Sequence, residues 1–256
     1  MFGAAGRMGR TVCAAVHGDP ELELVAAVDP QHDGLDLRSL TGLETDVHVY
    51  GAADGMTAGG AEVAIDFTAA EGARENARWC AANGVHAVIG TSGLTDDDVA
   101  DFRSRFTSSN CLVAPNFAIG AVLMIRLAEL SAPWFESVEV IEAHHDGKID
   151  APSGTAMYTA ERIAAASSTW APDPTTKNTL DHARGAEGAG GVHVHSLRVR
   201  GMVASQEVVF GTTGQSLTIR HDTYDRSSFM PGVLVAVKRI ADRPGVTLGL
   251  DGYLDI

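Results

Sequence analysis

The segment 142–156 carries side chains that can move a proton or bind an anion. His144 and His145 end an apolar run typical of a strand, and Lys148 follows four residues after His144. Imidazole and ammonium groups can donate protons in general acid catalysis. Because reducing a C=C or C=N bond needs one hydride and one proton, this spacing fits an enzyme that transfers hydride.

The residues after Lys148 predict an anion site beside these groups. Pro152, Ser153, Gly154 and Thr155 begin a predicted helix, which Ser153 or Thr155 can cap. The N–H groups of a helix start can bind a carboxylate, and Gly154 lets a ligand approach the backbone closely. The histidines, the lysine and the helix start together form a compact site for an anion.

A metal site is the main alternative for two adjacent histidines. Neighbouring side chains of a strand point to opposite faces, so His144 and His145 would not easily contact one ion. No carboxylate or cysteine lies at a usual ligand spacing from them. We therefore expect no metal, and expect acid–base or anion-binding roles for this segment.

A glycine-rich turn near the start of the chain is typical of dinucleotide binding. The turn consists of Gly3, Ala4, Ala5, Gly6, Arg7, Met8 and Gly9, followed by a helical pattern. Such a turn brings the backbone close to a pyrophosphate at a helix N-terminus. Asp29 lies about twenty residues further on, where a ribose hydroxyl acceptor belongs in this fingerprint.

Asp29 also bears on the choice of cofactor. Its carboxylate accepts hydrogen bonds from a ribose 2′-OH but repels a 2′-phosphate. No Arg or Lys follows between residues 30 and 36, and His32 is the nearest possible cation. We expect NADH to be favoured, with NADPH also accepted.

Only Met1 and Phe2 precede Gly3, whereas the fingerprint normally follows a full strand. Such a strand is central to its sheet, and its loss would be costly. We therefore expect the natural chain to begin a few residues upstream of Met1.

The composition excludes several classes of function. The chain has 256 residues, 45% of them hydrophobic, and a formal charge of −14, so nucleic acid would be repelled. No apolar run reaches the roughly 18–20 residues that span a bilayer, and no secretory leader is present. The cysteines Cys13, Cys80 and Cys111 form no metal-type pair. We expect a cytoplasmic protein with reduced core thiols and no membrane partner.

The order of predicted elements indicates an α/β fold. Before Asn116, strands alternate with helices, which is typical of a Rossmann-type parallel sheet domain. The predicted strands here are 22–29, 62–67, 85–90 and 111–114, and the helices 10–16, 72–83 and 96–107. Residues 41–60 have a loop-like composition.

After Asn116 the pattern predicts a second α+β domain with an open mixed sheet. Its predicted elements are helix 120–130, strand 137–144, a helix from about 153, and strands 192–200, 206–210 and 216–221. A final helix is predicted after this domain, at 231–243. Residues 167–191 have no apolar period and predict a long surface loop. Residues 211–215 are expected to join the last two strands as a hairpin.

With these motifs in view, the sequence resembles the dihydrodipicolinate reductases, also called 4-hydroxy-tetrahydrodipicolinate reductases, of bacterial and plant lysine and diaminopimelate synthesis. The resemblance runs through nearly the whole chain. It rests on 3–9, on Asp66-Phe67-Thr68, on 90–93, on 114–117, on Glu142-Ala143-His144-His145 and on 150–156. The last segment, combined with His-His-x-x-Lys, is the most specific.

The resemblance implies roles for individual residues. His144 and Lys148 match the proton donor groups of the family, and His145 matches a substrate-binding histidine. Gly154 and Thr155 match the pair that holds a substrate carboxylate. The nicotinamide end of the cofactor is matched by Gly90, Thr91 and Ser92 and by Ala114, Pro115, Asn116 and Phe117.

The resemblance also implies two domains and an assembly. Residues 1–118 and 225–256 would bind the dinucleotide, and residues 119–224 would bind substrate and mediate oligomerisation, usually as a homotetramer through the second sheet. The dicarboxylated ring would be reduced between the domains. Two residues depart from the family pattern: Ser92 replaces a threonine, and Gly147 replaces a residue that is often polar or basic. The role of Arg226 stays open.

Two other functions compete with this interpretation. A semialdehyde dehydrogenase of similar architecture would need a nucleophilic cysteine in the second domain, but all three cysteines precede residue 112. An amino-acid dehydrogenase of similar architecture is a further alternative. A protein that only senses dinucleotides would bind the cofactor without needing the His-His-Lys cluster.

Overall fold

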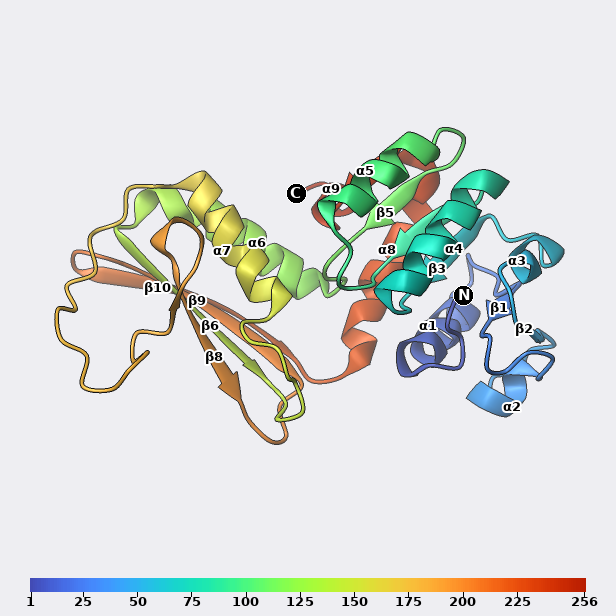
Figure 1. The fold of residues 1–256 in the computed structure, drawn as a ribbon, viewed down its shortest axis with the longest axis horizontal. Helices are drawn as coiled ribbons and strands as arrows, with labels where there is room; N and C mark the ends of the chain where they lie inside the picture. Colours follow the sequence, from blue (N-terminus) through green and yellow to red (C-terminus); the bar gives the residue numbers. More distant parts are fainter. The chain divides into compact units, whose positions relative to one another are not determined.

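The structure is a computed structural model that describes residues 1–256. The chain forms two compact units, one made of Met1–Phe117 and Phe229–Ile256 and the other of Ala118–Ser228. The bounds of these units lie within four residues of the predicted domain bounds. Each unit is described by itself (Figure 1).

The first unit is built around a parallel sheet. Its strands are β1 (Ala27–Val28), β2 (Val49–Tyr50), β3 (Val63–Asp66), β4 (His86–Ile89), β5 (Cys111–Val113) and β11 (Val246–Leu248). β1 pairs with β2, and the other four lie in the order β11-β5-β4-β3, with every pair parallel. Phe2 bridges both Val28 and Asp66, and so joins the two groups of strands.

Two residues occupy the position that a central strand takes in this fold class. The amino group of Met1 is buried and donates to the Ala26 carbonyl at 2.9 Å. The Phe2 N–H donates to the Ile65 carbonyl at 2.9 Å. Because burial disfavours charge, the pKa of the Met1 amino group is lowered.

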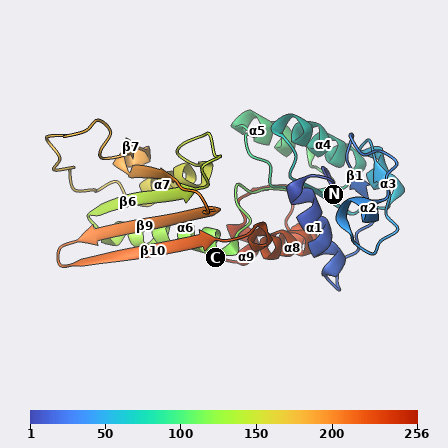
Figure 2. The same ribbon diagram turned by 90° about the horizontal axis from the view of Figure 1, so that it is seen from below.

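Helices cover both faces of this sheet. They are α1 (Arg7–Gly18), α2 (Leu37–Thr41), α3 (Asp54–Ala58), α4 (Ala70–Asn83), α5 (Asp96–Arg105), α8 (Met230–Arg239) and α9 (Asp251–Leu254). Figure 2 shows α4 and α5 on one side and α1 and α8 on the other. The strands between them are short apolar runs, as expected for a sheet buried on both faces. Phe2, Ile89 and Phe102 belong to the core.

The second unit is an open mixed sheet with helices on one face. Its strands are β6 (Ser137–His144), β7 (Ala186–Glu187), β8 (His193–Arg198), β9 (Ala204–Thr212) and β10 (Gln215–Thr223), in the order β10-β9-β6-β8-β7. β6 pairs with β8 in parallel, and the other pairs are antiparallel. The helices α6 (Ile119–Ser131) and α7 (Gly154–Ala166) pack their alanines against Val140, Val208 and Phe210. The predicted fold class, a Rossmann-type sheet domain plus an α+β domain with an open mixed sheet, is confirmed.

Several predicted elements were wrong in extent. The predicted strand 22–29 is regular only at Ala27–Val28, and the segment predicted as loop-like, 41–60, contains β2 and α3. β7 lies within the predicted long loop. Register pairs Gln215 with Thr212, so the hairpin turn has two residues instead of the predicted five. Gly214, with a φ of 81°, meets the need of such a turn for a left-handed residue.

The cysteines lie in the core of the first unit. Cys13, Cys80 and Cys111 are buried and unpaired with one another. Burial raises the pKa of all three thiols, that of Cys80 to about 12. None of the helices combines the length and apolar character required to cross a membrane.

Replacing Gly9 by alanine should destabilise the first unit. A Cβ at Gly9 would lie 2.0 Å from the Gly3 carbonyl oxygen and 2.8 Å from the Ala4 Cα, so backbone would have to move. We expect Gly9→Ala to lose at least the ~1–3 kcal/mol typical of overpacking. Thermal unfolding measures the loss. Gly18→Ala in the same helix is the control, because its Cβ would meet nothing within 4 Å; equal midpoints for the two variants would contradict the prediction.

Candidate functional site

The glycine turn forms a cradle at the start of α1. Gly3 has a φ of 66°, and a Cβ there would lie 3.0 Å from Thr68 Cγ2. The Gly6 N–H donates to the Gly3 carbonyl at 3.0 Å, which closes the turn. α1 begins at Arg7 without a side-chain cap. An uncapped helix start beside a close-packed backbone turn fits a phosphate-bearing ligand.

Asp29 lies beside this turn, directly after β1. Its Oδ2 accepts the Ala5 N–H at 3.2 Å, and its Oδ1 lies 2.9 Å from His32 Nδ1. Partial burial opposes ionisation, but the hydrogen bonds from His32 and from the Gln31 and Ala5 N–H groups prevail and lower the pKa of Asp29. The turn and an ionised carboxylate therefore lie together, as the dinucleotide fingerprint requires.

A second buried carboxylate organises the carboxyl ends of β3 and β4. Asp66 accepts hydrogen bonds from the Thr68 N–H and hydroxyl at 2.7 Å each, and from Asn76 Nδ2 at 2.7 Å. It also accepts from the Thr91 hydroxyl at 3.2 Å. Neutral donors thus hold the loop after β3 to the loop after β4.

The two loops predicted to contact the nicotinamide lie together at this edge of the sheet. A Cβ at Gly90 would lie 2.1 Å from Phe67 Cε1, so only glycine leaves room for this ring. Phe67 in turn packs on Phe117, with ring centroids 5.5 Å apart. Of the other predicted positions, Thr91 and Ala114 are buried, Asn116 is half-buried, and Ser92 and Pro115 are exposed.

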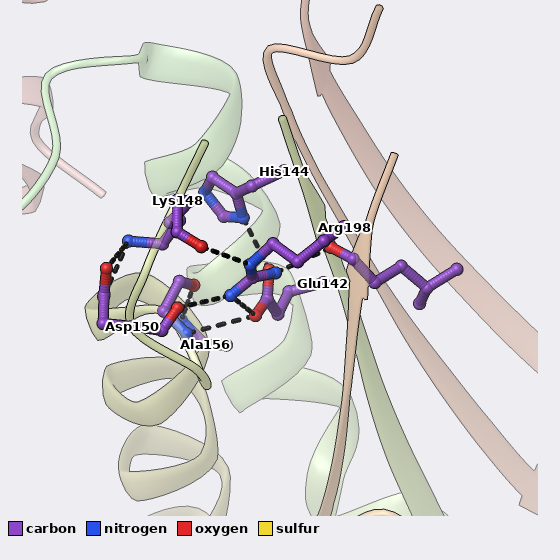
Figure 3. A network of polar contacts seen from close by, with 8 residues as sticks. Glu142, His144, Lys148, Asp150, Ala156 and Arg198 are labelled. Carbon is purple, nitrogen blue, oxygen red and sulfur yellow. Dashed lines mark hydrogen bonds and ion pairs between the residues drawn. The ribbon is translucent and has the colours of Figure 1, made fainter. Parts of the chain in front are cut away.

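In the second unit, His144 belongs to a polar network shown in Figure 3. Its Nδ1 lies 2.5 Å from Oε2 of Glu142, whose side chain has no exposed surface. Arg198 donates to both carboxylate oxygens of Glu142, at 3.0 Å each. The Ser153 N–H donates to Oε1 of Glu142 at 3.2 Å, which links β6 to the start of α7.

The electrostatics of this network favour a charged glutamate beside a neutral histidine. Burial would raise the pKa of Glu142, but hydrogen bonds from Arg198, Ser196 and His144 outweigh it and lower that pKa. Burial lowers the pKa of His144 below its usual value of 6.5, although Glu142 opposes the shift. An ionised carboxylate only accepts hydrogen bonds, so Nδ1 of His144 carries the hydrogen.

Lys148 lies on the exposed loop after β6. Its ammonium contacts both carboxylate oxygens of Asp150, at 2.8 and 2.7 Å. This ion pair lowers the pKa of Asp150. The positive charge of Lys148 also lowers the pKa of His144, so the two predicted acid–base groups interact.

The start of α7 completes the site. The Ser153 hydroxyl accepts the Ala156 N–H at 3.2 Å, so Ser153 is the cap of this helix. Gly154 is exposed, and a Cβ there would meet nothing within 4 Å. Thr155 is half-buried and His145 is exposed. The structure thus brings His144, the Lys148 loop and the helix start together. It arranges no group of three or more His, Cys, Asp or Glu side chains to hold a metal ion.

Sequence reasoning missed the roles of Glu142 and Arg198. Glu142 lies two residues before His144, and this spacing on a strand places both on one face. The spacing within Glu142-Ala143-His144 therefore indicates the pair. Arg198 lies 54 residues after His144 and reaches it only because β6 and β8 pair in register. No local pattern identifies it.

Comparisons with known proteins agree with this architecture. The profile of the dihydrodipicolinate reductase N-terminus matches residues 1–117, and that of the C-terminus matches residues 120–254. A 4-hydroxy-tetrahydrodipicolinate reductase of Corynebacterium urealyticum is 48% identical over all of this chain and 98% of its own length. One from Cutibacterium acnes is 46% identical with the same coverage.

A solved structure extends the likeness to three dimensions. The dipicolinate-bound dihydrodipicolinate reductase from Paenisporosarcina sp. TG-14 superposes with a TM-score of 0.85 at 38% identity. The superposition covers 98% of this chain and 97% of that one. The profile matches, the full-length relatives and the shared fold agree: this chain belongs to the dihydrodipicolinate reductase family of NAD(P)H-dependent oxidoreductases.

Proposed function

We propose that this chain reduces 4-hydroxy-tetrahydrodipicolinate to tetrahydrodipicolinate in lysine and diaminopimelate biosynthesis, with Lys148 and His144 as its acid–base groups. One observation carries the assignment of residues. The buried Glu142 bonds both the neutral ring of His144 and the start of α7, and Lys148 lies on the loop between these two elements. Each turnover consumes one hydride and one proton and releases one water.

The first unit supplies the cofactor site. The uncapped start of α1 would hold the pyrophosphate, and Asp29 a ribose hydroxyl. The segments 90–92 and 114–117 would contact the nicotinamide, which supplies a hydride to the substrate when bound. Asp29 favours NADH because its ionised carboxylate repels a 2′-phosphate, while NADPH remains usable.

The second unit supplies the proton and holds the substrate. Lys148 is the donor, because His144 is neutral at pH 7 and its Nδ1 hydrogen is engaged by Glu142. His144 supports Lys148 with its second ring nitrogen. Gly154, Thr155 and His145 bind the carboxylates of the ring, and the open space over Gly154 supports this role. The dipicolinate bound in the Paenisporosarcina relative is also a six-membered nitrogen ring with two carboxylates.

The family resemblance and one uncovered sheet face support a homotetramer. α6 and α7 pack on one face of the mixed sheet (Figures 1 and 2). The opposite face presents Ile141, Leu197 and Val209 between charged residues, and Leu197 is 43% exposed. A second copy of this face would bury these apolar side chains. We place the enzyme in the cytoplasm, where its unpaired cysteines fit a reducing compartment.

Lys148→Ala tests the proton donor. Removing a general acid should lower kcat by roughly 10²–10⁴-fold. Cofactor affinity should stay within about twofold, because Lys148 belongs to the other unit. Steady-state NADH oxidation with the product of the preceding synthase step measures kcat, and fluorescence titration measures the affinity. Lys177→Ala removes an exposed lysine and should keep full turnover; full turnover in Lys148→Ala would refute the role.

Asp29→Ser tests the cofactor preference. The variant loses hydrogen bonds to a charged group, each worth about 1.5–3 kcal/mol. We expect KM for NADH to rise about tenfold or more, while KM for NADPH falls or stays constant, because the repulsion of a 2′-phosphate is removed. Asp46→Ser changes the net charge equally at an exposed position of the same unit. An unchanged ratio of the two KM values in Asp29→Ser would contradict the assignment.

Ile141→Asp tests the tetramer. Ile141 lies on the central strand of the uncovered face, opposite His195 and Glu207. Four copies of an unpaired carboxylate in one interface should prevent assembly. Light scattering coupled to size exclusion should therefore give the mass of a smaller species. Leu35→Asp, at an exposed leucine of the first unit, should leave the mass unchanged. A tetramer that persists in Ile141→Asp would rule out this face as the interface.

A further inference from the structure

The pair formed by Glu142 and Arg198 contacts every part of the proposed acid–base site. Glu142 bonds the ring of His144 and the N–H of Ser153. Arg198 donates to Glu142 and also to the carbonyl oxygens of Lys148, at 3.3 Å, and Asp150, at 2.6 Å. His144, the Lys148 loop and the start of α7 are all attached to these two residues (Figure 3).

We propose that Glu142 and Arg198 are positioning residues: Glu142 selects the tautomer of His144, and Arg198 fixes the loop that carries Lys148. The inference rests on the proposed function, since it assigns how the same acid–base site is prepared. Neither residue is required to touch substrate or cofactor.

The hydrogen bonds of Glu142 determine the tautomer. Oε1 accepts from Ser153 and Arg198, and Oε2 accepts from Arg198 and His144. A carboxylate in this state has only acceptor sites, so the ring must present an N–H to it. While the ring is neutral, Nε2 is therefore left with a lone pair. This nitrogen can accept a hydrogen bond but cannot itself donate a proton.

Burial keeps the histidine neutral despite the adjacent carboxylate, and the positive charges of Lys148 and Arg198 add to this effect. The charged groups that face His144 are Glu142 from its own strand, Lys148 from the following loop and Arg198 from β8. Glu142 alone would favour a protonated ring, but burial and the two cations favour the neutral one. The buried ion pair thus provides the hydrogen-bond acceptor without turning His144 into a cation.

Arg198 also holds the loop that carries Lys148, by bonding its backbone. The residues from Asp146 to Ala151 belong to no helix or strand, and most are exposed. Two of their carbonyl oxygens, those of Lys148 and Asp150, accept hydrogen bonds from the one guanidinium. The guanidinium is planar with five donors in fixed directions, so lysine cannot replace it at this position.

Glu142→Gln tests the tautomer with little change in shape. The Ser153 N–H and Nη2 of Arg198 both bond Oε1 in the unaltered protein, so the amide oxygen takes that position and the amide NH₂ replaces Oε2, facing Nδ1 of His144. Nη1 of Arg198 then loses its bond to Oε2 but keeps the Leu197 carbonyl as an acceptor. The ring hydrogen then moves to Nε2. The corresponding Asp→Asn change in a Ser-His-Asp triad lowers kcat about 10⁴-fold. We expect kcat to fall roughly 10²-fold or more by the same cause, with KM for both substrates within about threefold.

The direct readout is ¹⁵N NMR of the histidine ring, with the His144 signals assigned by their absence in His144→Gln. We expect the Nδ1–H tautomer in the unaltered protein and the Nε2–H tautomer in Glu142→Gln. The pH profile gives a second readout. Activity that needs neutral His144 falls as the pH drops through its pKa, which lies below the usual 6.5. Removing the negative charge of Glu142 lowers this pKa further, so the acid limb should shift to lower pH.

Arg198→Lys and Arg198→Met test the loop. Both should lower kcat at least tenfold, and Arg198→Lys should not restore it, although it keeps the charge. If Arg198→Met fails to fold because Glu142 is left as a buried unpaired charge, the double variant Glu142→Gln/Arg198→Met removes that charge and should fold without recovering turnover. Arg200→Met is the matched control, because Arg200 pairs with Asp146 of the same loop but is 91% exposed. It should keep full turnover.

Two results would overturn the proposal. One is a His144 ring that carries its hydrogen on Nε2 in the unaltered protein, and the other is full turnover in Glu142→Gln or Arg198→Lys. Failure of the proposed function would look different. In that case the unaltered protein would not oxidise NADH with this substrate, while the NMR measurement would still report the tautomer.

Discussion

The Glu142 carboxylate has no exposed surface, so its charge must be balanced by neighbouring side chains. The second unit is built around these neighbours. Leaving such a charge unpaired would cost several kcal/mol, so its partners are held as firmly as the fold itself. Those partners are Arg198 from β8, the ring of His144 and the N–H of Ser153. Because β6, β8 and α7 meet at the Glu142 side chain, the contacts that pack this unit also bring the residues of the acid–base site together.

The first unit holds its own buried carboxylate in a different way. Asp66 is also buried, but it is held by an amide, hydroxyl groups and a backbone N–H, with no cation among them. Neutral donors fix the loops after β3 and β4 without adding charge at the edge where a hydride would leave. In the second unit burial keeps His144 neutral, and the positive charges of Lys148 and Arg198 act in the same direction. The two buried carboxylates thus differ in their partners as their surroundings require.

The sequence predicted those parts of the site that are contiguous in the chain. The glycine turn with Asp29, the His144–Lys148 spacing and the Ser153 cap follow from local patterns, and the fold class follows from the order of elements. What it could not predict depends on pairing at long range. Arg198 reaches Glu142 through a strand register, and β11 joins the first sheet at the far end of the chain. β2 and α3 were missed because elements of two and five residues carry little periodic signal.

The site contains two ion pairs of different kinds, Glu142 with Arg198 and Lys148 with Asp150. The two cations are both 20% exposed, but Arg198 pairs with Glu142, whose side chain has no exposed surface, whereas Lys148 pairs with Asp150, whose side chain is 60% exposed. Exposed pairs contribute only about 0–1 kcal/mol, so Asp150 can release the ammonium at little cost when substrate binds. In a chain with a formal charge of −14, this release lets an anion reach a cation that the surface otherwise neutralises. The buried pair meanwhile keeps the backbone beneath Lys148 fixed, so the ammonium can change partners without the loop moving.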